Sequence, residues 1–236
     1  VQRQYDHDQL TLSMLYAYCE HYVLTLGTRS AGEISEFMDK LPGDEKQKLA
    51  QIRAAYTYQM LHPGIKMTSP GKELSREMET FFHDLNELYC SHPALWQKDH
   101  EYEGFEWIQL MKYEENVLTF MRKTEKPEET LVAVVNFAAV PYENYQIGVP
   151  FKGKYKEIFN SDRKEYGGMG AGNPRAKSSK AEECDERENS LKIRIPAFGA
   201  VVLSCTLAEK AEKKPLKKPA ARKRSTAKKT SKKPAA

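Results

Sequence analysis

Long hydrophobic runs are missing from this chain of 236 residues. Its longest apolar runs, such as residues 131–135, fall far short of the roughly 20 residues that a membrane-spanning helix needs. No secretory signal opens the sequence either. The first residue is Val1 rather than methionine, so we expect processing or a start within a longer reading frame.

Cysteine is also scarce, with four residues that lie far apart and form no C-x-x-C pair. None of them has a histidine nearby at the spacing of metal ligands. We therefore expect no zinc site and interpret them as reduced, mostly structural thiols of a cytoplasmic protein. They are Cys19, Cys90, Cys184 and Cys205.

The positive charge is concentrated at the C-terminus. The net charge is +4, yet residues 209–236 alone carry +10, so the remainder sums to −6. This tail has almost no large apolar side chain, so we expect it to be disordered. Its charge density favours nucleic acid or another polyanion as a partner. We prefer the alternative, a solubilising extension, because no aromatic side chain is interleaved for base stacking.

Helical periodicity dominates up to about residue 92. One predicted helix lies within residues 5–22, a second follows Asp44, and a third lies within residues 73–90. Asp44 and Gln47 have the spacing of a capping box, and residues 62–64 end the second helix. The apolar stripes consist of Leu10, Met14 and Tyr18, of Leu49, Ile52, Tyr56 and Met60, and of Leu74, Met78, Phe81, Leu85 and Leu88.

After about residue 93 the apolar residues alternate with a period of two, which is typical of strands. Leu191, Ile193 and Ile195 alternate with charged residues, whereas residues 130–137 are apolar on both faces and fit a central strand. Seven short predicted strands with no helix between them favour an antiparallel β-sandwich. Their sequences are FEWIQL, NVLTFMRK, TLVAVVNF, YQIGV, KYKEIF, SLKIRI and AVVLSC.

Six motifs in order resemble the C-terminal portion of a bacterial glycogen branching enzyme, which belongs to the α-amylase superfamily. They are QLTLSMLYAY, KLPGDEKQKLAQIRAAYTYQMLHPG, HDLNELYCSHPAL, EGFEWI, NFAAVPYENYQIGVP and IFNSDRKEYGGMGAGN. The resemblance runs from about Tyr5 to Leu207. It implies a (β/α)8 barrel followed by an all-β domain, transfer of an α-1,4-glucan chain to an α-1,6 branch, and no cofactor.

The loop after the predicted strand at residues 22–26 departs from the family. There the resemblance implies a histidine and an aspartate that hold the reacting sugar, but Thr28 and Arg29 occupy these positions in a loop one residue shorter. An oxocarbenium-like transition state needs nearby negative charge, and Arg29 supplies a positive one. The nearest carboxylates, Glu33 and Glu36, have a spacing of three that suits a solvated helix face.

Other family features are missing as well. The apolar residues between Gly64 and the third helix are only Ile65 and Met67, too few for a buried parallel strand, so we expect the eighth barrel strand to be absent. The nucleophile and the acid/base belong to earlier barrel strands, and residues 1–92 contain one plausible strand whereas a barrel needs eight. We therefore assign no catalytic, cofactor-binding or metal-binding residue and expect this chain alone to be inactive.

The β region departs less from the family. It keeps Asn-Ser-Asp, Tyr-Gly-Gly and Gly-Asn elements, with Met169 where serine is usual, but residues 178–190 replace a Trp-His-Gly segment. Trp96 and Trp107 are candidates for stacking on a sugar ring, although we favour a core position for Trp107.

The predicted fold class is α+β, in three parts. Residues 1–92 form a helical remnant of the barrel, residues 93–207 an antiparallel all-β sandwich, and residues 208–236 a disordered basic tail. We expect the helices to pack poorly without a barrel sheet, or to pack only against the sandwich. Three functions stay open: part of a branching enzyme without turnover of its own, a non-catalytic α-glucan-binding or scaffolding module, and a polyanion binder.

Overall fold

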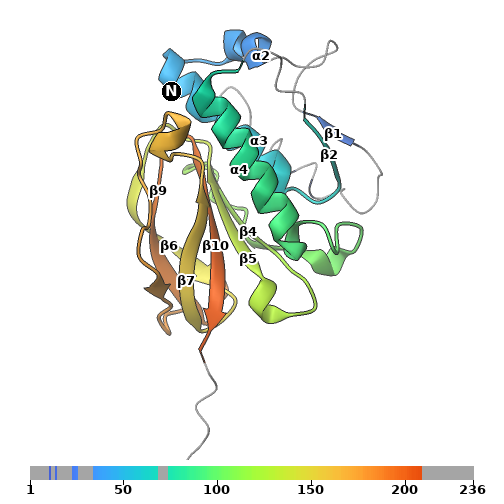
Figure 1. The fold of residues 1–236 in the computed structure, drawn as a ribbon. Helices are drawn as coiled ribbons and strands as arrows, with labels where there is room; N and C mark the ends of the chain where they lie inside the picture. Colours follow the sequence, from blue (N-terminus) through green and yellow to red (C-terminus); the bar gives the residue numbers. More distant parts are fainter. Residues whose placement is uncertain (1–10, 12–13, 15–22, 26–33, 69–73, 209–236) are drawn as a thin grey trace, which may run out of the picture.

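The computed structural model describes residues 11, 14, 23–25, 34–68 and 74–208. Within these ranges two long helices lie over one face of a six-stranded sheet, and a two-stranded sheet covers its other face (Figure 1). None of the helices described is long and apolar enough to cross a membrane. Several expectations lie outside the described residues: Leu10, Tyr18, the loop with Thr28 and Arg29, Glu33 and the basic tail from residue 209.

Helix α2 spans Ile34–Lys40, α3 spans Glu45–Leu61 and α4 spans Arg76–Ser91. Helix α3 begins where its predicted capping box places it, whereas α4 begins at Arg76, three residues after the expected start. The capping box is confirmed: the Asp44 carboxylate accepts from the Gln47 amide at 2.8 Å, and the Gln47 side chain accepts from the Asp44 amide at 3.1 Å. Helix α3 ends at the cap residue His62, before the predicted Pro-Gly stop.

The seven predicted strands of the β region are all confirmed, with β8, a two-residue strand, in addition. All neighbouring strands of the larger sheet are antiparallel, in the order β3-β4-β5-β10-β7-β8, and β6 pairs antiparallel with β9. The strands are β3 (Phe105–Gln109), β4 (Val117–Arg122), β5 (Leu131–Asn136), β6 (Tyr142–Val149), β7 (Gly153–Asn160), β8 (Lys177–Ser178), β9 (Asn189–Ile195) and β10 (Gly199–Leu207).

Strand β5 shows why this chain has two cores. All of its residues are buried, as the predicted central strand requires. Leu131, Ala133 and Val135 belong to the core under the helices, whereas Val132 and Val134 belong to the core between the two sheets. Because successive side chains of a strand point to opposite faces, an uninterrupted apolar run can serve both layers.

The helices pack well on the sheet, so the expectation of poor packing is wrong for α3 and α4. Helix α3 contacts β5 and β10, and α4 packs beside it. Ile52, Leu61, Phe81 and Leu85 are fully buried in a core that also contains Phe120 of β4. The predicted apolar stripes therefore cover the sheet of the β region itself.

A short strand forms where we expected none. Strand β1 (Val23–Thr25) pairs in parallel with β2 (Ile65–Met67), and α2 and α3 lie between them in the chain. The expectation of a missing strand is therefore wrong, although β2 is not buried: Ile65 and Met67 are 60% and 58% exposed. Lys66, between them, points inward instead.

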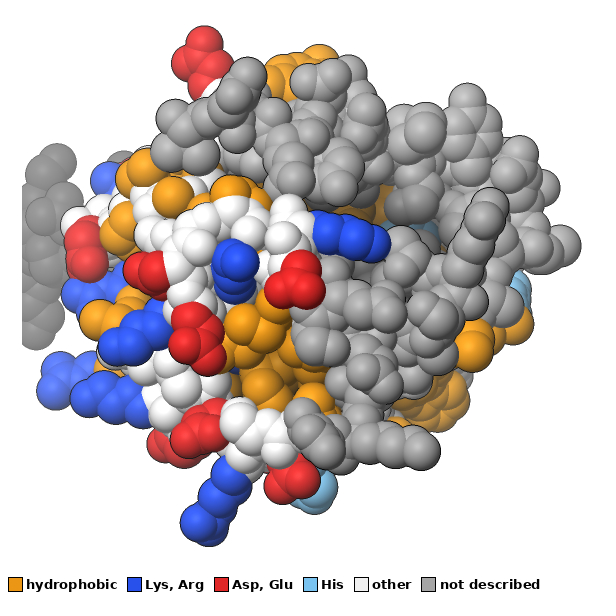
Figure 2. Space-filling model, turned by 90° about the horizontal axis from the view of Figure 1, so that it is seen from above, with side chains coloured by type: hydrophobic (Ala, Val, Ile, Leu, Met, Phe, Trp, Pro, Cys, Tyr) orange, Lys and Arg blue, Asp and Glu red, His pale blue; other side chains and the backbone are white. Residues whose placement is uncertain are grey.

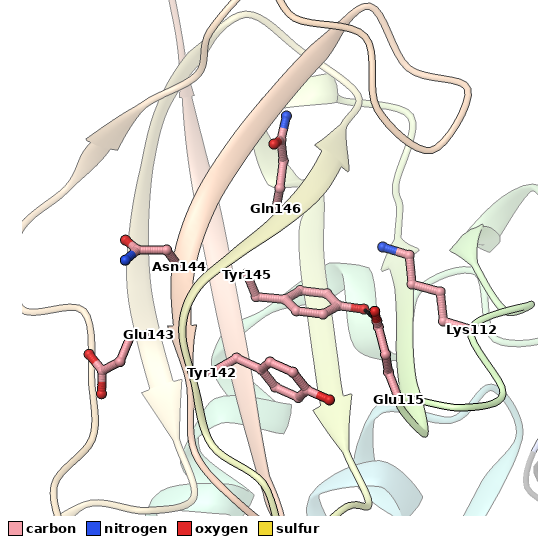
Figure 3. Close-up of a pocket in the computed structure, with 7 residues that line it drawn as sticks. All are labelled: Lys112, Glu115, Tyr142, Glu143, Asn144, Tyr145 and Gln146. Atoms are coloured by element: carbon pink, nitrogen blue, oxygen red, sulfur yellow. Dashed lines mark hydrogen bonds between the residues drawn. The ribbon is translucent and has the colours of Figure 1, made fainter.

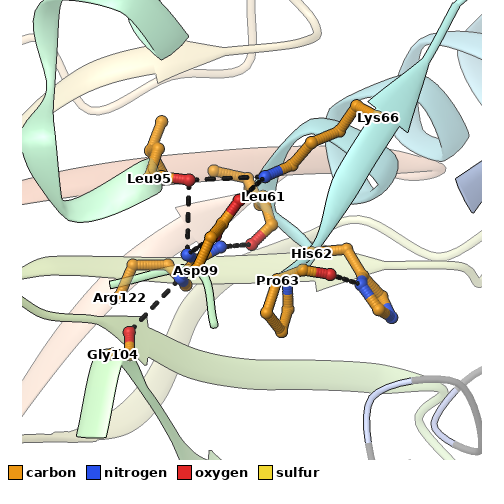
Figure 4. Close-up of polar contacts among 8 residues, drawn as sticks. All are labelled: Leu61, His62, Pro63, Lys66, Leu95, Asp99, Gly104 and Arg122. Atoms are coloured by element: carbon orange, nitrogen blue, oxygen red, sulfur yellow. Dashed lines mark hydrogen bonds and ion pairs between the residues drawn. The ribbon is translucent and has the colours of Figure 1, made fainter. Parts of the chain in front are cut away.

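Arg122, at the end of β4, connects the helical and β regions (Figure 4). Its side chain is fully buried and pairs with Asp99, which also accepts from the Lys66 ammonium at 2.6 Å. The guanidinium further donates to three backbone carbonyls that come from the end of α3, from the 3-10 turn η1 (Pro93–Leu95) and from the 3-10 turn η2 (Tyr102–Gly104). These carbonyls belong to Leu61 (2.8 Å), Leu95 (3.3 Å) and Gly104 (3.3 Å).

Burial controls the charges around this arginine. Burial lowers the pKa of the Lys66 ammonium to about 8, although the negative charge of Asp99 opposes this shift. Burial, together with the nearby cations Arg122 and Lys66, lowers the pKa of His62 to about 4. A neutral His62 therefore leaves one carboxylate to balance two cations, and its protonation would add a third positive charge.

Replacement of Arg122 by methionine should strongly destabilise the protein, because three carbonyls and a carboxylate lose their buried donor. We expect the free energy of unfolding, from urea denaturation, to fall by roughly 3 kcal/mol. Lys126→Met is the control, since Lys126 is exposed and pairs with Glu129 at the surface, and it should leave the free energy of unfolding close to that of wild type. Equal effects of both substitutions would contradict the role of Arg122.

Acid should destabilise the protein through His62. Because its folded pKa lies below its unfolded value of about 6.5, His62 contributes stability above pH 6.5 that is lost as the pH falls toward 4. Between these pH values, wild type should lose roughly 2–3 kcal/mol more than His62→Asn in matched urea titrations. Parallel pH profiles for the two proteins would show that His62 is not buried in its neutral form.

Candidate functional site

The loop with the departure at Thr28 and Arg29 is flanked by β1 and α2, but it lies outside the described residues. Glu36 lies within α2. The assignment that no residue is catalytic, cofactor-binding or metal-binding therefore stays a prediction. The family motif between β7 and β8, in contrast, is described in full.

Asp162 organises the tight turn formed by this motif. Its two carboxylate oxygens accept from the backbone amides of Met169 and Ala171, each at 2.9 Å. The turn includes the 3-10 segment η4 (Lys164–Tyr166), and its Gly167 has φ +76°, which favours glycine. At Gly168 a Cβ atom would lie 2.3 Å from the Asp162 carbonyl oxygen, so only glycine fits. The Asn-Ser-Asp and Tyr-Gly-Gly elements thus fold one turn.

The asparagine side chains of the motif also form hydrogen bonds within the protein. Asn160 donates to the Ala171 carbonyl at 2.9 Å. Asn173 donates to the Glu157 carboxylate and exchanges two hydrogen bonds with the backbone of Arg194, at 2.8 and 2.9 Å. Met169 is 80% exposed, and Lys164 and Glu165 of the same turn are exposed as well. The side chains of Asn160, Asp162 and Asn173, in contrast, serve the fold.

The same turn holds the helices on the sheet. The buried Arg53 of α3 donates to the Ser161 carbonyl at 2.8 Å, and the Tyr166 hydroxyl donates to Asp84 of α4 at 2.7 Å. Burial, followed by the hydrogen bond to Asp84, raises the pKa of Tyr166, so its hydroxyl stays a donor. The ring of Tyr166 also packs 5.5 Å from that of Phe81.

One group on α4 has the composition of a metal site. Ligand atoms of His83, Asp84 and Glu87 lie within 4.8 Å of one another. Asp84, however, already accepts from Tyr166 and lies near Arg163, at 4.0 Å. We therefore interpret these side chains as part of the contact between α4 and the turn, and not as a metal site.

The two tryptophans differ in their environment. Trp107 packs against the core through Phe105 and Phe120, with ring centroids 5.0 and 5.8 Å away. Trp96 is 45% exposed and follows η1. The preferred core position of Trp107 is confirmed, and its ring is engaged by two aromatic neighbours.

A pocket that the sequence did not indicate lies at the start of β6 (Figure 3). Two tyrosines, Tyr142 and Tyr145, point into it together with Glu115 and Lys112 from the segment between β3 and β4. The two tyrosines are three residues apart, a spacing that normally places side chains on opposite faces of a strand. The register shift between them brings both rings to one side.

Residues 107–206 match the alpha-amylase C-terminal all-beta domain. The chain is similar to the 1,4-alpha-glucan branching enzyme GlgB of Bacillus cereus (strain AH820), with 36% identity over 90% of this chain and 36% of the relative. The enzyme of the same name from Bacillus anthracis is 35% identical over the same shares. The chain thus spans about a third of the length of these relatives. Among solved structures, a debranching enzyme from Nostoc punctiforme aligns with a TM-score of 0.43 and 12% identity, over 68% of this chain and 31% of that one.

Asp162→Ala should destabilise the protein by roughly 2–3 kcal/mol, because the amides of Met169 and Ala171 lose their acceptors. Glu165→Ala in the same turn is the control, since Glu165 is exposed, and it should have an effect of about 0.5 kcal/mol or less. Thermal and urea unfolding of the two variants would measure the difference. A stable Asp162 variant would show that the turn folds without its carboxylate.

Proposed function

We propose that this chain serves in glycogen biosynthesis as the C-terminal portion of a 1,4-α-glucan branching enzyme. The premise is its resemblance to that portion of the bacterial enzymes, which belong to the α-amylase superfamily. The observation that carries the proposal is the identity of 36% along 90% of the chain. The match to the alpha-amylase C-terminal all-beta domain covers most of the sandwich. An α-glucan is the partner that this function implies, and the cytoplasm is the compartment.

The helical segment acts in this proposal as the last part of a (β/α)8 barrel. The parallel pairing of β1 with β2 across two helices supports it, because this is the connection between successive strands of an α/β sheet. The orientation of β2 also supports it, since Ile65 and Met67 face outward and a parallel sheet is normally covered on both faces. Seen from above, hydrophobic side chains are exposed on this face of the described part of the chain (Figure 2).

We further propose that this chain has no turnover of its own. The family's nucleophile and acid/base belong to earlier barrel strands, and Arg29 stands at the position of the transition-state aspartate. A permanent positive charge there opposes an oxocarbenium-like transition state. The alignment with the Bacillus cereus relative has 237 positions but includes only 90% of the 236 residues of this chain. The remaining positions are gaps in this chain, which agrees with shortened loops.

A non-catalytic glucan-binding module is the second candidate function. The specific observation in its favour is the open pocket with two tyrosines at the start of β6. Polyanion binding would depend on residues 209–236, which lie outside the described residues, and no feature of the described part favours it.

Two chimaeras test the main proposal. In the first, the N-terminal part of the Bacillus cereus relative is joined to this chain; in the second, the relative's own segments also replace residues 27–37 and 65–72. We expect both to be soluble, and the second to form α-1,6 linkages from amylose at least about a hundredfold faster, because it regains the transition-state carboxylate. The 236-residue chain alone should form none.

Branching by the first chimaera at the rate of the second would contradict the proposed lack of turnover, and a folded second chimaera that forms no α-1,6 linkages would contradict the main proposal. Variants with a single segment restored separate the effect of the loop from that of the strand. Linkages are measured as the new chain ends released by a debranching enzyme. Circular dichroism of each chimaera confirms that a missing activity does not reflect unfolding.

A further inference from the structure

The pocket at the start of β6 is open to solvent and has the volume of a small-molecule site. Its volume is about 340 Å³, and it is lined by Lys112, Glu115, Tyr142, Glu143, Asn144, Tyr145 and Gln146. Pockets of a few hundred cubic ångströms with a few convergent polar groups are typical ligand sites. None of its lining residues belongs to the Asp162 turn or to the Arg122 network, so neither of these explains it.

Contacts inside the pocket hold one of its tyrosines in place. The Tyr145 hydroxyl donates to the Glu115 carboxylate, and the Lys112 ammonium lies 4.7 Å from the centre of the Tyr145 ring. Lys112 is itself fixed by Asp185, at 3.4 Å. Burial, followed by the hydrogen bond to Glu115, raises the pKa of Tyr145, so its hydroxyl keeps its proton. Tyr145, Glu115 and Lys112 therefore form a prearranged polar wall.

Tyr142 is the more accessible ring. It is half-buried, and its ring centroid lies 5.0 Å from that of Tyr145 at an angle of 58°. Within the described part of the chain no hydrogen bond to its hydroxyl is present. An aromatic ring with one accessible face, next to a carboxylate and an ammonium group, combines an apolar surface with donors and acceptors at its edge.

This combination favours a neutral, polyhydroxylated ring over a charged ligand. Lys112 already occupies the cation-binding face of Tyr145, which disfavours a second cation there. The Glu115 carboxylate would repel an anion, whereas Glu143 is paired with Arg194. A sugar ring has an apolar C–H face that can pack on Tyr142, and its hydroxyl groups can bond to Glu115 and Lys112.

We propose that this pocket binds a glucosyl unit of an α-1,4-glucan, with the Tyr142 ring against the sugar face and with Glu115 and Lys112 bonded to its hydroxyl groups. The choice of glucan among saccharides rests on the proposed function. The site is a binding site, remote in sequence from the barrel segment, and it holds a chain of glucose residues on the β region without acting on it.

Titration of the full chain with maltoheptaose, monitored by calorimetry, tests this proposal. We expect Tyr142→Ala to weaken binding about tenfold, because the sugar loses its stacking surface, and Tyr142→Phe, which keeps the ring, to stay within about threefold of wild type. Tyr102→Ala is the matched control, since Tyr102 is an exposed tyrosine that does not line the pocket, and it should bind as wild type.

Two results would overturn the proposal: no binding of maltoheptaose at millimolar concentrations by the wild-type chain, or wild-type affinity in Tyr142→Ala. Unfolding curves of each variant show whether a loss of binding reflects a loss of structure. If Tyr142→Ala fails to fold, the affinities of Tyr142→Phe and Glu115→Ala for maltoheptaose are compared instead. Glu115→Ala should lose affinity, whereas Tyr142→Phe should keep it. The test is independent of the chimaeras, since a chain that fails to bind maltoheptaose can still complete a branching enzyme.

Discussion

A single buried guanidinium sets the main constraint on this structure. Arg122 is fully buried at the end of β4, and its donors reach one carboxylate and three backbone carbonyls from separate segments. A buried charge of this kind is tolerated only when its partners are all in place. The end of α3, the turns η1 and η2, and strand β4 therefore have to take up their positions together, with His62 neutral beside them.

The turn around Asp162 holds the helices on the sheet at a second place, near the middle of α3 and α4. Arg53 reaches it from α3 and Asp84 reaches it from α4, while the Asp162 carboxylate closes the turn itself. The helices and the sheet are thus joined at two places and share a core. This structural role accounts for the Asn-Ser-Asp and Tyr-Gly-Gly elements of the motif.

The sequence predicted the local structure well and the tertiary roles of polar residues poorly. Capping of α3 and the two-faced burial of β5 follow from residue types and periodicity alone, and the structure confirms both. Lys66 breaks the pattern, because a lysine between two apolar residues is expected to point outward and instead pairs with Asp99. The pocket was missed because a β-bulge, which periodicity does not reveal, places Tyr142 and Tyr145 on one side.

The central claim is that helices α3 and α4 form one cooperative body with the sandwich, independent of a complete barrel. Native-state hydrogen exchange tests it most directly, because it measures the opening free energy of each amide. The amides in the middle of α3 should exchange with the same opening free energy as those of β5 and β10. Opening of α3 at a free energy several kcal/mol below that of the two strands would contradict the account.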